Sequence, residues 1–211
     1  HGVGSSVVNA LSTEMSVRIF RDGKEHLIEF ENGGKVKSPL KVVNAKSTEA
    51  TGTEVTFKPD PEIFSTTKFK LDVIEKRLRE KAFLMKGLKI SIIDERKEDV
   101  KEITYQFENG LADYIAFENK GKRTISPVYY YTNVDDATGV DVEVSLQWND
   151  DFNENTSSFV NNVRTKDGGT HETGFKTALS KAVNAVAKEK NLLKAKDKNL
   201  EGADIREGLT A

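Results

Sequence analysis

Hydrophobic and polar residues alternate along the first part of the chain with the two-residue period of half-buried β-strands. This alternation predicts strands over residues 16–20, 25–30 and 53–57. Asp22-Gly23 separates the first two strands, and this dipeptide suits a tight hairpin turn, whose central residues need positive φ. Asn32-Gly33-Gly34 predicts a second turn.

The pattern becomes helical over residues 68–84, where apolar positions recur three and four residues apart. These positions are Leu71, Ile74, Leu78 and Ala82. Lysines and arginines occupy the opposite face, which predicts an amphipathic helix that stops at Gly87. Strands over residues 88–94 and 103–107 are expected to follow it and to pair as a hairpin.

A domain boundary is expected after residue 107, so that residues 1–107 and 108–211 form two domains. The second domain is expected to hold a short helix and then three strands. These elements cover residues 111–118, 127–131, 140–148 and 157–163. Its clearest helix takes Thr170 as its cap and carries one apolar stripe. The stripe consists of Phe175, Leu179, Ala182, Val183 and Val186. The predicted fold class is therefore α+β in both domains.

Composition narrows the functional classes. The 211 residues are 36% hydrophobic and 31% charged, and 34 acids against 32 bases give a net charge of −2. This balance argues against a protein that coats nucleic acid through bulk positive charge. The absence of cysteine excludes disulfides and thiolate metal sites. No apolar run approaches the roughly 20 residues that span a bilayer.

The first six residues form a glycine-rich loop, His1-Gly2-Val3-Gly4-Ser5-Ser6, which leads directly into a helical pattern over residues 7–11. Glycines let backbone amides approach anionic oxygens closely, and a serine cap at a helix start would add partial positive charge. Taken alone, the loop fits a phosphate-binding site or an ordinary turn. Because ordinary domains do not begin within such a loop, we expect the chain to be part of a longer protein.

Other candidate residues have simpler interpretations. His171 could be catalytic or bind a metal, but no second histidine lies nearby, which favours a structural role at a helix start. Asp135-Asp136 and residues 149–151 could hold a cation, although acidic turns between strands are common. The three tyrosines at residues 129–131, together with Trp148, could stack on bases, but their alternating strand positions favour packing in the core.

A lysine-rich segment runs from Lys188 to Lys198. Five lysines among few acids could contact DNA, and the same pattern fits the solvated end of a helix. Both interpretations remain open at this point.

Four segments together resemble one protein family, the ATPase subunits of type IIA DNA topoisomerases. They are residues 1–12, 51–60, 158–175 and 206–211. The first resembles the family's ATP lid, and the second resembles the Gly-Thr strand behind its nucleotide pocket. The third resembles the hallmark stretch of its transducer domain, and the fourth resembles a helix that follows. The order and spacing agree along essentially the whole chain, so the glycine loop is interpreted as an ATP lid.

The resemblance implies a fold for each predicted domain. Residues 1–107 would be the C-terminal part of a GHKL (Bergerat-type) ATPase domain, starting at the lid. Residues 108–211 would be a transducer domain of the ribosomal-protein-S5-domain-2-like α/β fold, cut short at its C-terminus.

The resemblance also implies which residues bind the cofactors, ATP and Mg²⁺. The lid residues His1, Gly2, Val3 and Gly4, with Ser5 beside them, would offer backbone amides to the β- and γ-phosphates, while Mg²⁺ would neutralise the remaining charge. Thr53 would hydrogen-bond near the adenine edge, directly or through water. Arg21 would lie at the mouth of the pocket; its local sequence also fits an exposed arginine before a turn.

The resemblance places no catalytic residue in this chain. The family's general-base glutamate, its Mg²⁺-binding asparagine and its adenine-binding aspartate precede the lid, and its γ-phosphate lysine follows residue 211. Phosphoryl transfer depends on groups that activate water and stabilise developing charge. We therefore expect this chain alone not to hydrolyse ATP, whereas the longer protein does.

The implied function is that of an ATP-dependent DNA topoisomerase that acts in chromosome segregation. ATP binding and hydrolysis would drive clamp dimerisation and the passage of one DNA strand pair through another. Residues 30–34 and 199–204 favour the topoisomerase IV (ParE) branch, with decatenation as its activity, over gyrase B and supercoiling. The partners would be DNA, an A-type (ParC-like) subunit in a heterotetramer and a second copy of the chain. The location would be the cytoplasm, at the nucleoid. A non-catalytic binding module that keeps only the fold is the other alternative.

Overall fold

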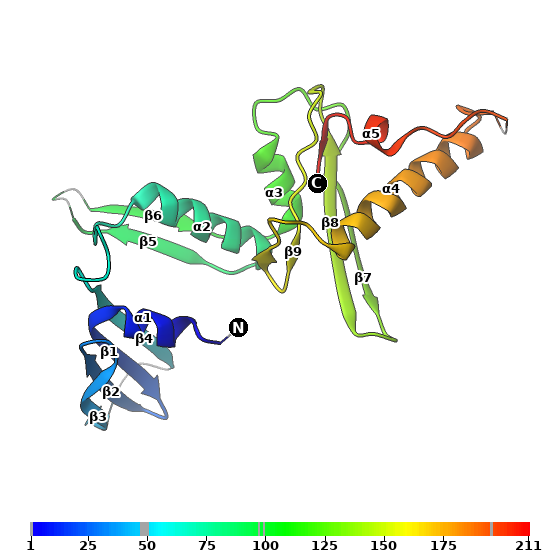
Figure 1. The fold of residues 1–211 in the computed structure, drawn as a ribbon. Helices are drawn as coiled ribbons and strands as arrows, with labels where there is room; N and C mark the ends of the chain where they lie inside the picture. Colours follow the sequence, from blue (N-terminus) through cyan, green and yellow to red (C-terminus); the bar gives the residue numbers. More distant parts are fainter. Residues whose placement is uncertain (1, 47–50, 97, 99, 195) are drawn as a thin grey trace. The chain divides into compact units, whose positions relative to one another are not determined.

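The computed structural model of the protein describes residues 2–46, 51–96, 98, 100–194 and 196–211. The chain divides into two compact units, His1–Phe69 and Lys70–Ala211. Figure 1 traces the chain through each of them.

The first unit is a four-stranded antiparallel sheet preceded by one short helix. Its elements are α1 (Gly4–Ala10), β1 (Ser12–Arg21), β2 (Lys24–Glu31), β3 (Lys35–Asn44) and β4 (Gly52–Pro59). The strand order is β3-β2-β1-β4, with every neighbouring pair antiparallel. Asp22 and Gly23 join β1 to β2 with φ values of 52° and 66°, which confirms the predicted hairpin turn.

Strand β3 was not expected from the sequence. Its residues include Pro39, which cannot donate a hydrogen bond to a neighbouring strand, and Lys35, Lys37 and Lys41. The sheet order explains how β3 forms nevertheless, because it is an edge strand paired only with β2. Proline and lysine are tolerated on edge strands, where they also discourage pairing with other chains.

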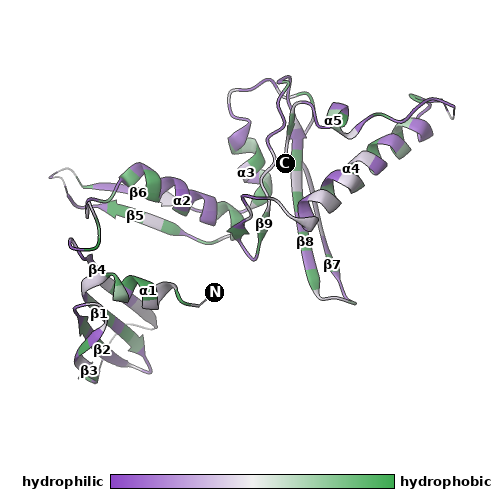
Figure 2. Ribbon diagram, viewed as in Figure 1, coloured by the Kyte–Doolittle hydropathy of each residue, from purple (hydrophilic) through white to green (hydrophobic). Residues whose placement is uncertain are grey.

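The second unit contains three small sheets and four helices in its described residues. The elements are α2 (Leu71–Leu84), β5 (Ile90–Asp94), β6 (Lys101–Tyr105), α3 (Leu111–Glu118), β7 (Tyr129–Asp135), β8 (Val140–Trp148), β9 (Phe159–Val160), β10 (Val163–Arg164), α4 (Thr170–Glu189), α5 (Gly202–Ile205) and β11 (Leu209–Thr210). The sheets have the orders β5-β6, β11-β8-β7 and β10-β9. Hydrophobic and hydrophilic residues alternate along β8 (Figure 2).

Three expectations for the second unit were wrong. The single strand over residues 157–163 is instead the β9–β10 hairpin, because Asn161 and Asn162 adopt φ values of 49° and 61° and reverse the chain. Residues 206–211 form a turn and β11 rather than a helix. Helix α4 begins after Gly169 as N-cap, so Thr170 lies inside its first turn and does not cap it.

An aromatic cluster forms the core beneath α2 and α3. Phe83 is 1% exposed, and its ring stacks on Phe107 at 3.7 Å and on Tyr114 at 4.9 Å between centroids. The ring of Phe117 lies 5.5 Å from Phe83, with the Arg79 guanidinium 4.5 Å above its centroid. This packing joins residues that lie before and after position 107. The two compact units divide between residues 69 and 70. The domain boundary expected after residue 107 stays a prediction.

A buried polar network joins α3, β8 and β11. Asn119 donates to the Gln147 side chain at 2.9 Å, and its own oxygen accepts from Asn149 at 3.1 Å and from Thr210 at 2.7 Å. Gln147 also donates to the Ser126 carbonyl at 3.0 Å. Buried amides that are all hydrogen-bonded fix one arrangement of the elements around them. The network therefore fixes where β11 joins the sheet.

Candidate functional site

The glycine loop is exposed and open to solvent. His1 lies outside the described residues, and Gly2 follows it with φ at +97°. A Cβ placed on Gly2 or Gly4 would meet no atom within 4 Å, and Val3 is 65% exposed. The loop is therefore open at both glycines, as a loop that wraps an anion requires.

The expected serine cap does not form. Helix α1 starts at Gly4 with Val3 as its N-cap, and no side chain bonds its first amides. The reason is that Val3 already has α-helical φ and ψ, which places Ser5 and Ser6 inside the first turn instead of before it. The amides of that turn have no partner within the helix.

The other end of α1 is fixed to the sheet. The Leu11 amide donates to the Val7 carbonyl at 3.0 Å, and the Ser12 hydroxyl donates to the Val8 carbonyl at 2.6 Å. The Asp60 amide at the end of β4 donates to the Leu11 carbonyl at 3.0 Å. The helix is thus anchored where it meets β1, while the glycine loop lies at its unanchored end.

Thr53 lies on an apolar face of the first sheet. In the antiparallel register it is directly opposite Ile19 of β1, and directly opposite residues point to the same face. Val55 is paired with Val17 and Phe57 with Met15 in the same way. Val55 is 50% exposed and Phe57 41% exposed, whereas Met15 is buried. The face is therefore an open apolar surface with a hydroxyl group at one end.

Two further polar side chains lie at the Thr53 end of this face. Arg21 is two residues beyond Ile19 on β1, so it points to the same side, and its side chain is 77% exposed with Asp22 3.7 Å away. His26 of β2 is paired with Ile19 from the other flank. Sequence reasoning missed His26, although the Asp22-Gly23 turn fixes this register. A planar ligand with a polar edge suits such a surface.

The structure does not bring Thr53 and the glycine loop together. Thr53 pairs with Ile19, seven residues along β1 from Ser12 at the end of α1. Seven residues of strand span about 23 Å at roughly 3.3 Å each, which separates Thr53 from the C-terminal end of α1; the glycine loop lies at the other end of this helix. In the part of the chain that the structure describes, no hydrogen bond or ion pair joins Thr53 to Gly2–Ser5. No polar contact therefore links Thr53 to the loop among the described residues.

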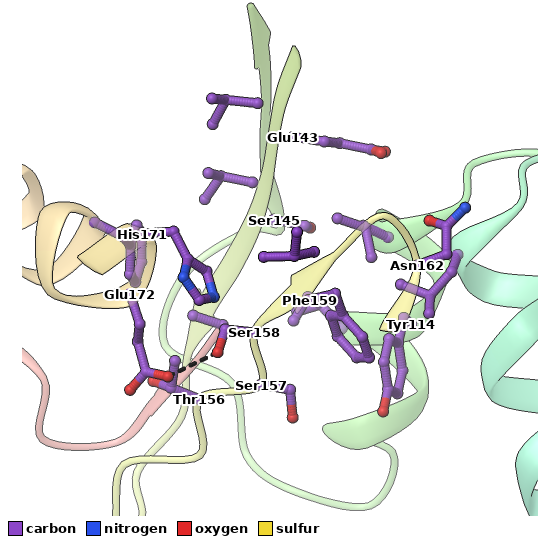
Figure 3. A pocket seen from close by; sticks show the side chains of 18 of the residues that line it. Tyr114, Glu143, Ser145, Thr156, Ser157, Ser158, Phe159, Asn162, His171 and Glu172 are labelled. Carbon is purple, nitrogen blue, oxygen red and sulfur yellow. Dashed lines mark hydrogen bonds between the residues drawn. The ribbon is translucent and has the colours of Figure 1, made fainter. Parts of the chain in front are cut away.

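The second unit has a cavity of about 700 Å³ between β8, α3 and the start of α4 (Figure 3). Its polar lining contains Ser158, whose hydroxyl donates to Glu172 at 2.7 Å. His171 also lines it, and its Nε2 lies 2.9 Å from the Thr165 hydroxyl. Thr165 bonds Ser158 in turn at 2.7 Å. His171 is thus held at the helix start through Thr165, and it does not pair with Ser158 as a base pairs with a nucleophile.

A charged cluster beside the cavity joins three segments of the second unit. Glu154 accepts from Lys176 of α4 at 2.9 Å and from Arg206 at 2.8 Å, and it also accepts from Thr156. Burial alone would raise the pKa of Glu154, but these hydrogen bonds outweigh it and lower the pKa to about 2. Lys176 also pairs with Glu172 at 2.9 Å.

This cluster predicts acid sensitivity. The lowered pKa of Glu154 means that its contribution is complete above its ordinary value near 4.5 and is lost as the pH falls towards 2. After solvent screening we expect a contribution of about 1–2 kcal/mol. Urea unfolding between pH 6 and pH 2.5 should show Glu154→Gln less stable than wild type at pH 6, with the difference in stability shrinking as the pH falls below 4.5. The exposed Glu207→Gln should follow wild type throughout; a constant deficit in Glu154→Gln would contradict the assignment.

The acidic side chains of the two turns make local hydrogen bonds and an ion pair. Asp135 accepts from the Thr138 hydroxyl at 2.6 Å and from the Ala137 amide, and these bonds lower its pKa. Asp151 pairs with Lys122 at 3.1 Å, and its amide bonds Asn149. Across the described residues, no group of three or more His, Cys, Asp or Glu side chains could hold a metal ion.

The tyrosines do not pack as expected. Tyr129, Tyr130 and Tyr131 are 51%, 46% and 61% exposed, so the prediction of core packing was wrong for them. The reason is that all seven residues of β7 are exposed, so neither face of the strand is covered in the described part of the chain. The lysines of the segment from Lys188 to Lys198 are all exposed as well. Among the helices that the structure describes, none is both long and apolar enough to cross a membrane.

Comparison with known proteins gives one consistent family. A family model for DNA gyrase B matches residues 110–211. The B subunit of DNA topoisomerase 4 from Enterococcus faecalis is 52% identical over all 211 residues, which are 30% of that protein's length. The corresponding protein from Streptococcus pneumoniae is also 52% identical over the whole chain and 32% of its own length. The chain therefore spans about a third of the curated relatives it matches.

Solved structures agree with these relatives. The 43K ATPase domain of Thermus thermophilus gyrase B, in complex with an aminocoumarin, is 40% identical with a TM-score of 0.83. The match covers 99% of this chain and 56% of that one. The topoisomerase IV ATP-binding domain of Francisella tularensis, in complex with a small-molecule inhibitor, is 30% identical with a TM-score of 0.79, covering 99% and 55%. The chain belongs to the B subunits of bacterial type IIA DNA topoisomerases, the family that contains gyrase B and its topoisomerase IV counterpart.

Proposed function

We propose that this chain is the lid-and-transducer segment of the B subunit of topoisomerase IV, an enzyme that uses ATP to separate linked DNA duplexes. The observation that carries the proposal is the 52% identity to a topoisomerase 4 B subunit over all 211 residues. Similarity that runs without interruption through both units supports a shared function more strongly than a single motif would.

The apolar face of the first sheet is proposed to hold the adenine of ATP. A planar aromatic ring can lie on the surface formed by Ile19, Val17 and Val55, and burying apolar area there favours binding by roughly 25 cal/mol per Å². Thr53 would hydrogen-bond the polar edge of the ring, and the Arg21 guanidinium would stack on the ligand or bond to it.

The lid residues His1, Gly2, Val3, Gly4 and Ser5 are proposed to bind the phosphates. The open space in front of Gly2 and Gly4 supports this role, because backbone amides can reach the oxygens without a Cβ between them. No hydrogen bond or ion pair joins the lid to Thr53 among the described residues, and we propose that the lid closes over the bound nucleotide. We propose that Mg²⁺ enters with the phosphates, since the described residues form no metal-binding group of their own.

Residues 108–211 are proposed to be the transducer domain, and residues 1–107 the end of the GHKL domain. The gyrase B family model starts at residue 110, close to this boundary. The proposed partners are DNA, an A-type subunit in a heterotetramer and a second copy of the B subunit that joins when ATP binds. The enzyme would act in the cytoplasm, at the nucleoid. Gyrase B is the second candidate, because a gyrase B domain is the solved neighbour with 40% identity.

The two candidates differ in the reaction of the whole enzyme. The complete B subunit, combined with its A-type subunit and ATP, should decatenate linked DNA circles and should not introduce negative supercoils into relaxed plasmid. Supercoiling would assign gyrase B instead, and activity without ATP would overturn both. The 211-residue chain alone should show no ATP turnover.

The nucleotide face is tested by two threonines on one strand. Thr53→Ala in the complete B subunit should raise the Kd of a non-hydrolysable ATP analogue about two- to tenfold, the effect of one lost hydrogen bond. Thr56→Ala is the matched control, because Thr56 is also exposed on β4 but points to the opposite face. Isothermal titration calorimetry measures both. Equal effects of the two substitutions would contradict the assigned face.

A further inference from the structure

The tetrapeptide Phe-Glu-Asn-Gly occurs twice in the chain, at residues 30–33 and at residues 107–110. Asn-Gly is a dipeptide prone to spontaneous deamidation, because glycine has no Cβ to keep its backbone nitrogen away from the asparagine side chain. The same four residues surround the reacting groups in both copies. A large difference in reactivity between the two copies must therefore come from the fold.

The reaction needs only the asparagine, the amide that follows it and water. The glycine backbone nitrogen attacks the asparagine Cγ and forms an N–Cγ bond. The Cγ–Nδ2 bond breaks, and ammonia leaves with the proton that the backbone nitrogen has lost. Water then opens the succinimide ring at either carbonyl and leaves aspartate or isoaspartate. The first step requires a glycine N–H that can lose its proton and a side chain that can turn towards it.

The copy in the first unit is protected by the sheet. The Gly33 amide, which would be the nucleophile, donates to the Ser12 carbonyl at 3.0 Å. The Asn32 amide donates to the Thr13 carbonyl at 2.8 Å. These two bonds join the turn after β2 to the first residues of β1. The Gly33 nitrogen can lose its proton only when this part of the sheet opens.

The copy in the second unit lacks this protection. Gly110 is buried, and its amide donates no hydrogen bond to any residue that the structure describes. Asn109 is exposed to the water that the second step consumes. Its restraint is the Asp113 carboxylate, which accepts from the Asn109 backbone amide at 3.0 Å and from its Nδ2 at 3.1 Å. Both bonds are exposed, so water competes with them.

We propose that Asn109 is a site of spontaneous deamidation, whereas Asn32, in the same tetrapeptide, is protected. The product changes the start of α3. An aspartate at position 109 has no donor for Asp113 and places two carboxylates against each other. Isoaspartate adds a methylene group to the main chain between Phe107 of the aromatic core and α3. Deamidation therefore destabilises the second unit.

The two copies can be compared within one sample. The complete B subunit is aged in a mildly alkaline buffer, and its peptides are mapped by mass spectrometry. Conversion at Asn109 should be about five times faster than at Asn32, the factor that one intact hydrogen bond contributes. In urea the two rates should converge, because the unfolded chain presents the same tetrapeptide twice. Equal rates in the folded protein, or faster conversion at Asn32, would overturn the proposal.

Two substitutions test the parts of the site. Asp113→Asn weakens the restraint on the side chain and should raise the rate at Asn109 about twofold, with Asn32 unchanged; an unaltered rate would contradict the restraint. Asn109→Gln keeps an amide on a longer side chain that closes the ring poorly. Its resistance to urea should stay constant during ageing while that of wild type falls. An equal decline in both would show that position 109 is not the cause. The wild-type comparison needs neither variant to fold.

Discussion

Phe83→Ala is expected to lower the free energy of unfolding by about 3–5 kcal/mol, the usual effect of removing a buried aromatic ring. Phe83 is 1% exposed, and its ring contacts those of Phe107, Tyr114 and Phe117. The substitution removes apolar burial and leaves a cavity that the three rings cannot fill, because Tyr114 and Phe117 are both fixed on α3 and Phe107 is held by the backbone bond from Gly87 to its carbonyl. Native stabilities of about 5–15 kcal/mol make such a loss large.

Phe152→Ala is the matched control, since Phe152 is 83% exposed in the same unit. The same chemical change there should alter stability by no more than about 0.5 kcal/mol. Urea unfolding followed by the fluorescence of Trp148 measures both variants. Comparable losses in the two would contradict the assignment of Phe83 to the core.

Periodicity predicted the elements whose environment is set locally. The helix expected over residues 68–84 is α2, and the turn at Asp22-Gly23 fixes the β1–β2 register. Elements whose conformation depends on their place in a sheet or on unusual backbone angles were not predicted. β3 contains Pro39 and forms because it lies at a sheet edge. The strand expected over residues 157–163 failed because two asparagines in succession adopt positive φ, which alternation cannot reveal.

The candidate site likewise has features that the sequence can predict and features that it cannot. Strand alternation and register place Thr53, Ile19 and Arg21 on the same face of the sheet. This shared face could be derived from the sequence once the strand pairing was known. The position of the glycine loop could not, because it depends on where α1 is anchored. The contact of Glu154 with Arg206 joins residues far apart in the chain. Such a contact depends on tertiary packing and leaves no local signal.

Gly208→Ala is expected to destabilise the second unit by more than about 3 kcal/mol, because two separate penalties combine at one residue. Its φ of +68° is unfavourable for alanine, and a Cβ there would lie 2.2 Å from the Asn149 carbonyl oxygen and 2.7 Å from that of Asp151. Both obstacles are backbone atoms, so they can yield only if β11 moves. That movement would break the bond from the Asn149 amide to the Gly208 carbonyl, 2.9 Å long.

Gly121→Ala separates the two penalties. Gly121 has a similar φ of +85°, but a Cβ there would meet nothing within 4 Å. It should therefore cost only about 1–2 kcal/mol, the conformational part alone. Urea unfolding of the two variants gives the steric part as the difference. If Gly208→Ala cost no more than Gly121→Ala, the close approach of Gly208 to Asn149 would not exist, and the register in which β11 pairs with β8 would be wrong.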